Sequence, residues 1–113
     1  MTNEKRAPRI GLILSFHRAL LGAITDNLYA VAAWISADEK RLSVVGYYLG
    51  DPYANDEWEE LFVAVAEVCA DYVDIFIDEE RYVDARVEPL PEARRGALMF
   101  LRHVRGMWPN FNE

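Results

Sequence analysis

The spacing of large apolar residues in residues 55–72, "NDEWEELFVAVAEVCADY", constrains the fold most strongly. These residues recur at intervals of three and four, which is the period of one face of an α-helix. Asp51 or Asn55 can cap the first N–H groups, and the acids that follow suit the positive end of the helix dipole. We therefore predict a helix over residues 55–72. Its buried face is expected to consist of Trp58, Leu61, Phe62, Val65, Val68 and Cys69.

A second helical pattern lies upstream, over residues 9–24. Between the two helices the period changes, because residues 28–36 and 41–50 are rich in β-branched and aromatic side chains, which are typical of strands. The polar connection "ADEK" between them is short, so the two strands are expected to pair antiparallel. Gly46, inside the second strand, is a candidate bulge.

Residues 72–78 alternate, with Asp74, Phe76 and Asp78 expected on one face of a strand. Glu79 and Glu80 are expected to turn the chain. A further strand is predicted over residues 81–88, and residues 97–105 fit either a last strand or a short helix, since periodicity cannot decide for so short a run.

The predicted order is α-β-β-α-β-β, with residues 97–105 as a further strand if they are extended. This order favours an α+β fold in which two helices cover one face of a mostly antiparallel sheet of three to five strands. The chain has 113 residues, so we expect one domain, residues 1–113, with flexible tails at 1–7 and 106–113.

The net charge is -7, from 12 basic and 19 acidic side chains, and it argues against a nucleic-acid partner. Residues 51–80 hold eleven Asp and Glu residues and no Lys or Arg. Such a surface can bind a basic partner, or serve solubility alone. The lone Cys69 cannot form an internal disulfide and favours a reducing compartment. With no leader and no apolar run of about 20 residues, we expect a cytoplasmic protein without a membrane partner.

No residue pattern predicts catalysis, and we expect no enzyme activity, no cofactor and no metal site. Asp74 and Asp78 can be imagined around a divalent cation with the neighbouring glutamates, but the spacing matches no calcium loop. His17 and His103 are 86 positions apart, and the serines and glycines form no nucleophile elbow or phosphate loop.

The aromatic residues of the predicted hairpin can serve an interface or the core. Alternation sends Tyr47 and Tyr48 to opposite faces of the sheet, so one of them faces solvent unless something covers it. An exposed tyrosine near carboxylates suits a protein interface. Packing between neighbouring strands is the other interpretation.

Residues 15–51, "SFHRALLGAITDNLYAVAAWISADEKRLSVVGYYLGD", resemble the small immunity proteins of bacterial contact-dependent growth inhibition systems. The shared pattern is a helix ending in Arg-Ala-Leu-Leu-Gly, then Thr25-x-Asn27-Leu28, a strand with a tryptophan and a second strand rich in aromatics. The helix with an acidic start over residues 55–72 extends the resemblance to residues 15–72.

The resemblance implies a non-enzymatic inhibitor that stays in the cytoplasm and binds the toxic C-terminal domain of an effector delivered by a sibling cell. Many such toxins are nucleases with basic clefts, and the immunity gene lies immediately downstream of the effector gene. The acids would then form the recognition surface for a basic toxin domain. The alternative is a small enzyme or a small-molecule-binding α+β domain with a pocket between sheet and helices. The predicted partner-binding residues are Asp56, Glu57, Glu60, Glu67, Asp71, Asp78, Glu79 and Glu80.

Overall fold

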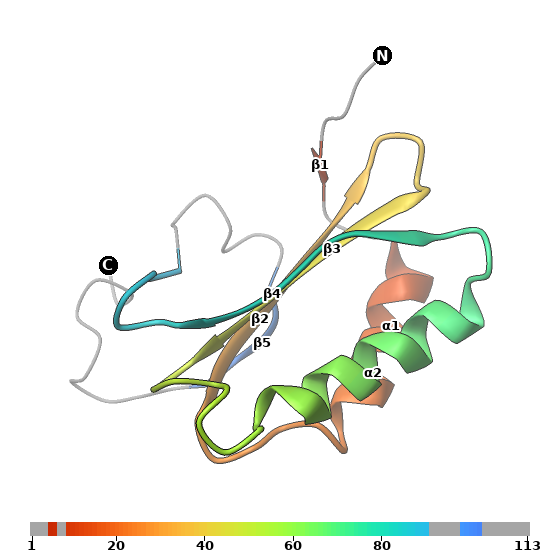
Figure 1. The fold of residues 1–113 in the computed structure, drawn as a ribbon. Helices are drawn as coiled ribbons and strands as arrows, with labels where there is room; N and C mark the ends of the chain where they lie inside the picture. Colours follow the sequence, from red (N-terminus) through yellow and green to blue (C-terminus); the bar gives the residue numbers. More distant parts are fainter. Residues whose placement is uncertain (1–4, 7–8, 91–97, 103–113) are drawn as a thin grey trace.

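The structure is a computed structural model that describes residues 5–6, 9–90 and 98–102. It is an α+β fold with two helices, as predicted (Figure 1). Most of the two expected tails lies outside the described residues, although Lys5–Arg6 forms a short strand. The elements are β1 (Lys5–Arg6), α1 (Ile10–Leu20), β2 (Leu28–Ser36), β3 (Arg41–Tyr48), α2 (Trp58–Asp71), β4 (Phe76–Asp84) and β5 (Leu98–Leu101).

The sheet has the strand order β1-β2-β3-β4, and β5 also pairs with β2. β1 pairs with the end of β2, where Lys5 lies opposite Ser36, and β5 pairs with the first half of β2, where Ala30 lies opposite Leu101. These pairs and the β2–β3 hairpin are antiparallel, so the expected mostly antiparallel sheet is confirmed. β3 and β4 are parallel, and α2 is the crossover that a parallel pair requires.

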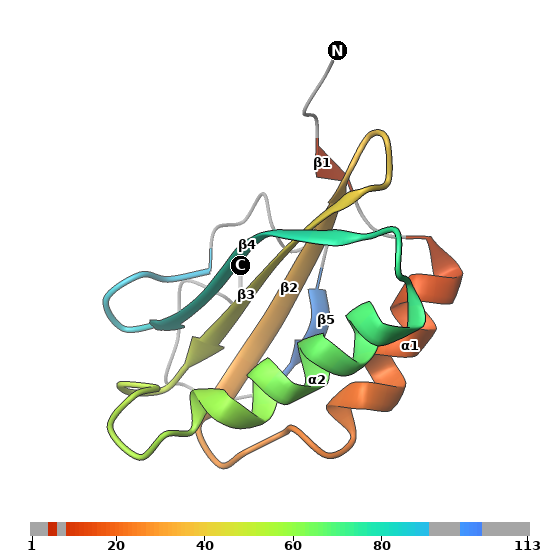
Figure 2. The same cartoon turned by 45° about the vertical axis from the view of Figure 1, so that its right-hand side comes forward.

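Both helices cover one face of this sheet (Figures 1 and 2). Side chains of α1 and α2 pack in one cluster with side chains of β2 and β3. The core between the layers takes apolar side chains from both helices and from the alternate positions of β2 and β3 that face them. Its fully buried members include Phe16, Leu28, Val31, Leu42, Val44, Tyr48, Leu61, Val65 and Val68.

The other face of the sheet is covered by the chain that follows β4. Ala85 and Leu90 pack there in a second cluster with Tyr47 and Val45. Tyr47 and Tyr48 do point to opposite faces, yet both are at most 1% exposed. Neither tyrosine therefore contributes to a surface, and packing within the fold is the correct interpretation for both.

Gly46 is not a bulge, contrary to expectation. It pairs in register with Val31 of β2 and Tyr82 of β4, and the register shift between β3 and β4 lies at Leu42/Ser43 instead. A Cβ atom at Gly46 would lie 2.5 Å from the Cδ2 atom of Leu61. The glycine is therefore explained by the close approach of α2 to the centre of the sheet.

The predicted buried face of α2 is partly wrong. Leu61, Val65 and Val68 are buried as expected, but Trp58 and Cys69 are only partly buried and Phe62 is 47% exposed. Ala64, which was not predicted to be buried, is buried instead of Phe62. The face is rotated because α2 packs against α1 as well as against the sheet, so the side bearing Ala64 is covered and the side bearing Phe62 lies at the margin.

Several predicted boundaries also differ. α1 ends at Leu20 and not at residue 24, and α2 begins at Trp58 because residues 52–57 form turns. Residues 72–75 are a turn and not a strand, and Glu79 and Glu80 lie within one continuous strand, β4, where a turn between two strands was expected. Residues 98–101 are a strand, which decides between the two alternatives for that segment.

Candidate functional site

The eight predicted carboxylates do not lie on one face. Glu60, Glu67 and Asp71 are spaced by seven and four residues, so they form one line along α2. The hydroxyl of Ser15 on α1 donates to the Asp71 carboxylate at 3.2 Å, which places this line on the side of α2 that faces α1. Glu60, Glu67 and Asp71 are all exposed. These three acids form one group.

Glu57 is engaged inside the molecule. Its carboxylate accepts hydrogen bonds from the hydroxyl of Thr25 and from the backbone N–H and side-chain amide of Asn27. The guanidinium of Arg102 donates to the carbonyl oxygens of Thr25 and Leu28 at 2.8 and 2.9 Å. The Thr-x-Asn-Leu pattern of residues 25–28 thus holds the start of α2 and the end of β5 to the start of β2. Asp56, beside Glu57, is exposed.

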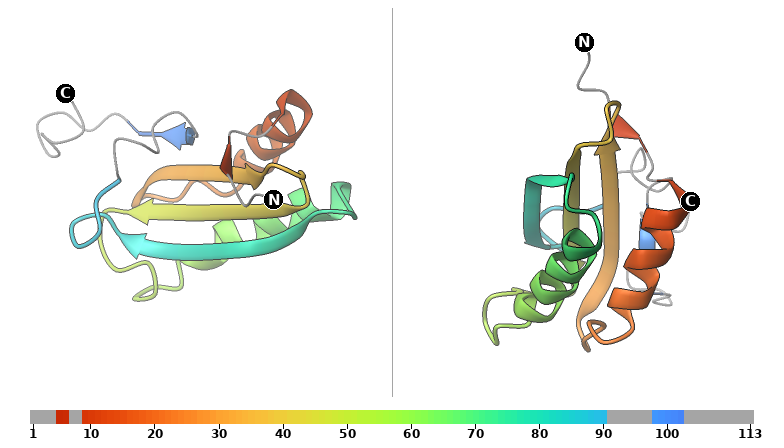
Figure 3. Two further views of the ribbon diagram at one scale, coloured as in Figure 1. Left: turned by 90° about the horizontal axis from the view of Figure 1, so that it is seen from above. Right: turned by 90° about the vertical axis from the view of Figure 1, so that its right-hand side faces the viewer.

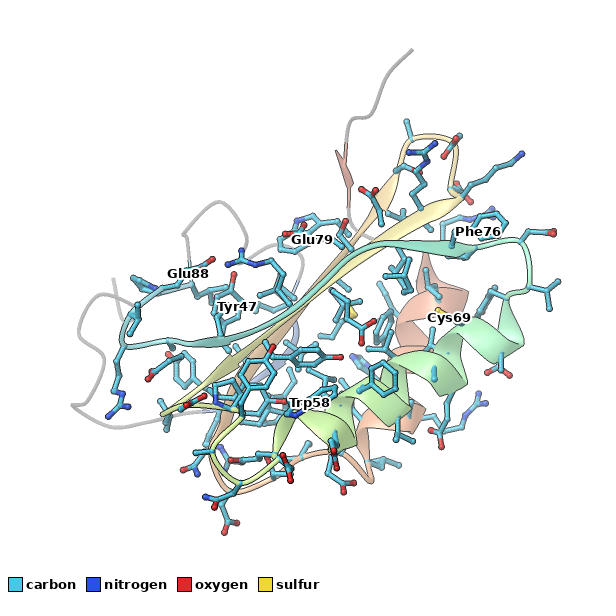
Figure 4. All side chains as sticks on the ribbon, viewed as in Figure 1. Tyr47, Trp58, Cys69, Phe76, Glu79 and Glu88 are labelled. Carbon is cyan, nitrogen blue, oxygen red and sulfur yellow. The ribbon has the colours of Figure 1, made fainter. Side chains whose placement is uncertain are left out.

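The three acids of β4 have different surroundings. Asp78 is exposed and lies where the β3–β4 register shifts. Glu79 lies 3.9 Å from Arg81, which also pairs with Glu88 at 2.5 Å, on the face opposite the helices. Glu80 is on the helix face and accepts a hydrogen bond from the hydroxyl of Tyr82. Figure 4 shows Glu79 and Phe76 on β4 and Glu88 beyond its end.

A group of rings that we call the aromatic patch lies between the start of α2 and β4. It consists of Tyr53, Trp58, Phe62 and Tyr82. The Trp58 ring lies at the centre, 5.8 Å from Tyr53, 5.6 Å from Phe62 and 5.5 Å from Tyr82, measured between ring centroids. Tyr53 and Phe62 are 53% and 47% exposed. Half-exposed rings packed around a central tryptophan are typical of the anchoring residues of protein interfaces.

Glu80 influences the titration of its neighbours within this region. Burial raises the pKa of the Tyr82 hydroxyl, and the hydrogen bond to Glu80 raises it further. Burial also raises the pKa of the Cys69 thiol, and the charge of Glu80 adds to the effect. The tyrosine and the cysteine are therefore kept neutral at pH 7, so the charge on this part of the surface comes from carboxylates.

The sequence did not predict the aromatic patch. Trp58 and Phe62 were assigned to the core because both fit the helical period of α2. Their spacing of four residues does show that they share a side of the helix. It does not show that this side lies at the margin of the sheet.

A cleft of about 810 Å³ opens at the end of the sheet near the β2–β3 turn. Arg9, Lys40, Asp38, Asp71, Tyr72 and Ile75 are among the residues that line it. Its size is typical of small-molecule sites, which occupy roughly 300–1,000 Å³. The cleft is the feature that favours the alternative of a small-molecule-binding domain.

The described residues were also considered for a metal site, for histidine chemistry and for a membrane-spanning helix. Within residues 5–6, 9–90 and 98–102, no three side chains of His, Cys, Asp or Glu gather where they could hold a metal ion. His17 is exposed on α1, and His103 lies outside these ranges. No helix among the same residues is long and apolar enough to cross a membrane.

Comparison with known families decides between the classes of function. The family model of the MafI2 immunity protein matches residues 9–104 of the chain. The chain belongs to the MafI2 immunity protein family. The match begins before α1 and ends after β5, so it covers both helices and every strand except β1. No curated protein matches the chain.

Membership of the MafI2 family confirms part of the interpretation from sequence. The expected relationship, an immunity protein of a toxin–immunity system, is correct. Immunity proteins of this kind are typically inhibitors and not enzymes.

Proposed function

We propose that this protein is a cytoplasmic inhibitor that binds the toxic C-terminal domain of an effector delivered by contact-dependent growth inhibition. Binding neutralises the toxin, and the protein catalyses no reaction. Its membership of the MafI2 family supports the toxin–immunity relationship. The resemblance of residues 15–72 supports the mode of delivery. In this proposal the toxin is a nuclease whose basic cleft the immunity protein blocks.

The observation that carries the proposal is the set of carboxylates that the fold leaves unused. Asp56, Glu60 and Glu67 are exposed, and their carboxylates make no hydrogen bond or ion pair with the described residues. They belong to a chain with a net charge of -7. Free carboxylates on such a chain attract a basic partner and can occupy the positions that nucleic-acid phosphates take in its cleft.

The aromatic patch supports a stable complex as well as a fast encounter. Charges at the rim of an interface mainly raise the association rate, whereas buried aromatic anchors slow dissociation. Tyr53 and Phe62 offer such anchors near Glu80 of β4, which accepts a hydrogen bond from Tyr82 in the same patch. Of the predicted partner-binding acids, Glu57 and Asp71 also serve the fold, so we expect their contribution to binding to be smaller.

Co-purification tests direct binding. The probe is the C-terminal domain of the effector encoded immediately upstream, produced as a catalytically inactive variant together with the full-length immunity protein. The proposal expects a stable complex and loss of toxicity when the active toxin is expressed with the immunity protein. Absence of a complex, with both proteins folded, would contradict it.

Association rates test the role of the acids. We compare Glu60→Gln with Glu88→Gln, which makes the same change in net charge on an acid that pairs with Arg81 beyond β4. Glu60→Gln should slow association several-fold at low salt and lose most of that difference at about 0.5 M salt, because exposed charges are screened there. Glu88→Gln should associate at the wild-type rate. Equal rates for both variants would remove Glu60 from the recognition surface.

A further inference from the structure

Among the strands of the described residues, β4 is the last one on its side of the sheet. It runs for nine residues and pairs with β3 along one edge. Along its other edge the described part of the chain places no strand, as Figure 3 shows. An edge strand of this length exposes a row of backbone donors and acceptors that another chain can use.

The pairing with β3 shows which backbone groups face outward. The N–H of Ala85 donates to the carbonyl oxygen of Tyr48 at 2.8 Å, so Ala85 faces β3. Successive residues of a strand direct their N–H and C=O groups to opposite edges. The backbone N–H and C=O groups of Glu79, Arg81 and Val83 therefore point toward β3, as those of Ala85 do. The backbone groups of Glu80 and Tyr82 point toward the open edge.

The side chains at these two positions connect the edge to the aromatic patch. Glu80 and Tyr82 lie on the helix face, and the Tyr82 ring packs 5.5 Å from the Trp58 ring. A strand added to this edge would present every second side chain to the same face. Those side chains would meet the aromatic patch directly, so one bound segment could use both the backbone groups and the rings.

The charge of β4 indicates which kind of strand can pair with its open edge. Three consecutive acids, Asp78, Glu79 and Glu80, lie in the first half of β4, and Phe76, 66% exposed, precedes them. A second copy of β4 would bring like charges together, which is a common device against self-pairing of edges. A basic strand has the opposite charge and is favoured.

We propose that β4 pairs with an extended basic segment of the cognate toxin, which becomes an additional strand of the sheet. Side chains of that segment pack against the aromatic patch. Recognition through backbone hydrogen bonds at a sheet edge gives affinity, and pockets for alternate side chains give specificity. This inference rests on the proposed function, since it names the surface by which the toxin is held.

Amide hydrogen exchange of the wild-type protein tests the inference. The probe is again the inactive C-terminal domain of the upstream effector. In the free protein, the amides of Glu80 and Tyr82 should exchange rapidly compared with those of Arg81 and Val83. In the complex, the exchange of both amides should slow about tenfold, which corresponds to one hydrogen bond of about 1.4 kcal/mol. A complex that leaves both amides unprotected would overturn the inference and leave the proposed function standing.

A pair of substitutions at one position separates backbone from side chain. Glu80→Ala removes the carboxylate and the acceptor for Tyr82 but keeps the N–H. Glu80→Pro removes the N–H as well, and proline is tolerated where an N–H faces away from the sheet. Glu80→Pro should weaken toxin binding about tenfold or more beyond Glu80→Ala. Equal binding by the two variants would contradict the inference. If no complex forms with the wild type, the proposed function itself fails, and the inference fails with it.

Discussion

The Glu57 carboxylate accepts hydrogen bonds from both nitrogens of Asn27, at 2.8 Å from the backbone N–H and 3.2 Å from the side-chain amide. The two residues are 30 positions apart in the chain, and their contact joins the turn before α2 to the loop that leads into β2. Thr25 donates to the same carboxylate. An acid in the most acidic stretch of the sequence is therefore part of the framework of the fold.

Replacing this carboxylate should destabilise the protein. Glu57→Ala leaves three donors without their acceptor, and hydrogen bonds to charged groups contribute about 1.5–3 kcal/mol each in favourable cases. Because the site is only partly buried, we expect a loss of about 1–3 kcal/mol in the free energy of unfolding, measured by chemical denaturation. Glu59→Ala is the control, since Glu59 is exposed and its carboxylate makes no hydrogen bond or ion pair with the described residues. It should change stability by less than about 0.5 kcal/mol.

Adjacent positions on α2 should respond very differently to truncation. Leu61 is 0% exposed in the core, whereas Phe62 is 47% exposed at the aromatic patch. Leu61→Ala should cost about 2–5 kcal/mol, because it leaves a cavity. Phe62→Ala should cost about 1 kcal/mol, because it loses only its contact with Trp58 and part of its burial. A denaturation midpoint that moves equally for both would show that the buried face of α2 is wrongly assigned.

Adding a methyl group at Gly46 should be costly. The new Cβ would lie 2.5 Å from Leu61 Cδ2 and 3.1 Å from Tyr48 Cε1, so buried side chains must move. We expect Gly46→Ala to cost about 1–3 kcal/mol. In a Leu61→Ala background the same change should cost less, since the obstructing atom is gone. Gly22→Ala is the control, because a Cβ there meets no atom within 4 Å. A cost at Gly46 that is the same in both backgrounds would disprove the clash with Leu61.

The contact between Asp84 and Arg86 should make stability depend on acid pH. Hydrogen bonds from the Arg86 side chain, at 2.9 and 3.1 Å, and from its backbone N–H lower the pKa of Asp84. The folded state therefore binds a proton less readily than the unfolded state, whose aspartates titrate near about 3.9. The contribution is present above that pH and is lost as pH falls through the folded pKa.

Asp84→Asn should accordingly reduce the free energy of unfolding at pH 7 by about 0.5–1 kcal/mol, the range of surface ion pairs. Near pH 2 the variant and the wild type should have the same stability. The control is Asp74→Asn, because Asp74 is exposed and its carboxylate has no partner among the described residues. It should match the wild type at both pH values. A difference for Asp84→Asn that persists unchanged at pH 2 would rule out the charge as its cause.

Local patterns in the sequence were sufficient for part of the fold. β2 has the predicted bounds, residues 28–36, because its β-branched and aromatic run is closed by polar residues at both ends. The direction of β4 was not predictable in this way. Alternation identifies a strand but not its neighbour, and the parallel pairing with β3 depends on how α2 crosses the sheet.

For the candidate site, the sequence predicted that acidic residues are abundant, but it did not predict how they are arranged. The excess of acids in residues 51–80 is visible in the sequence, but the partners that engage some of them are not. Ser15 and Asp71 are 56 residues apart, and Thr25 and Glu57 are 32 apart. The aromatic patch likewise depends on Tyr82, which only the placement of β4 brings to Trp58.

The fit of Leu61 over Gly46 also has a consequence for recognition. Leu61 lies so close over Gly46 that this packing opposes sliding or rotation of α2 on β3, and β3 in turn holds β4 by parallel pairing from Arg41 to Tyr48. Trp58 and Tyr82 are therefore held at a fixed separation before any partner arrives. Much of the entropic cost of ordering the binding surface is then already met during folding. Binding of the partner therefore carries a smaller entropic cost. Loosening this fit should shorten the lifetime of a complex even where every contacting side chain is retained.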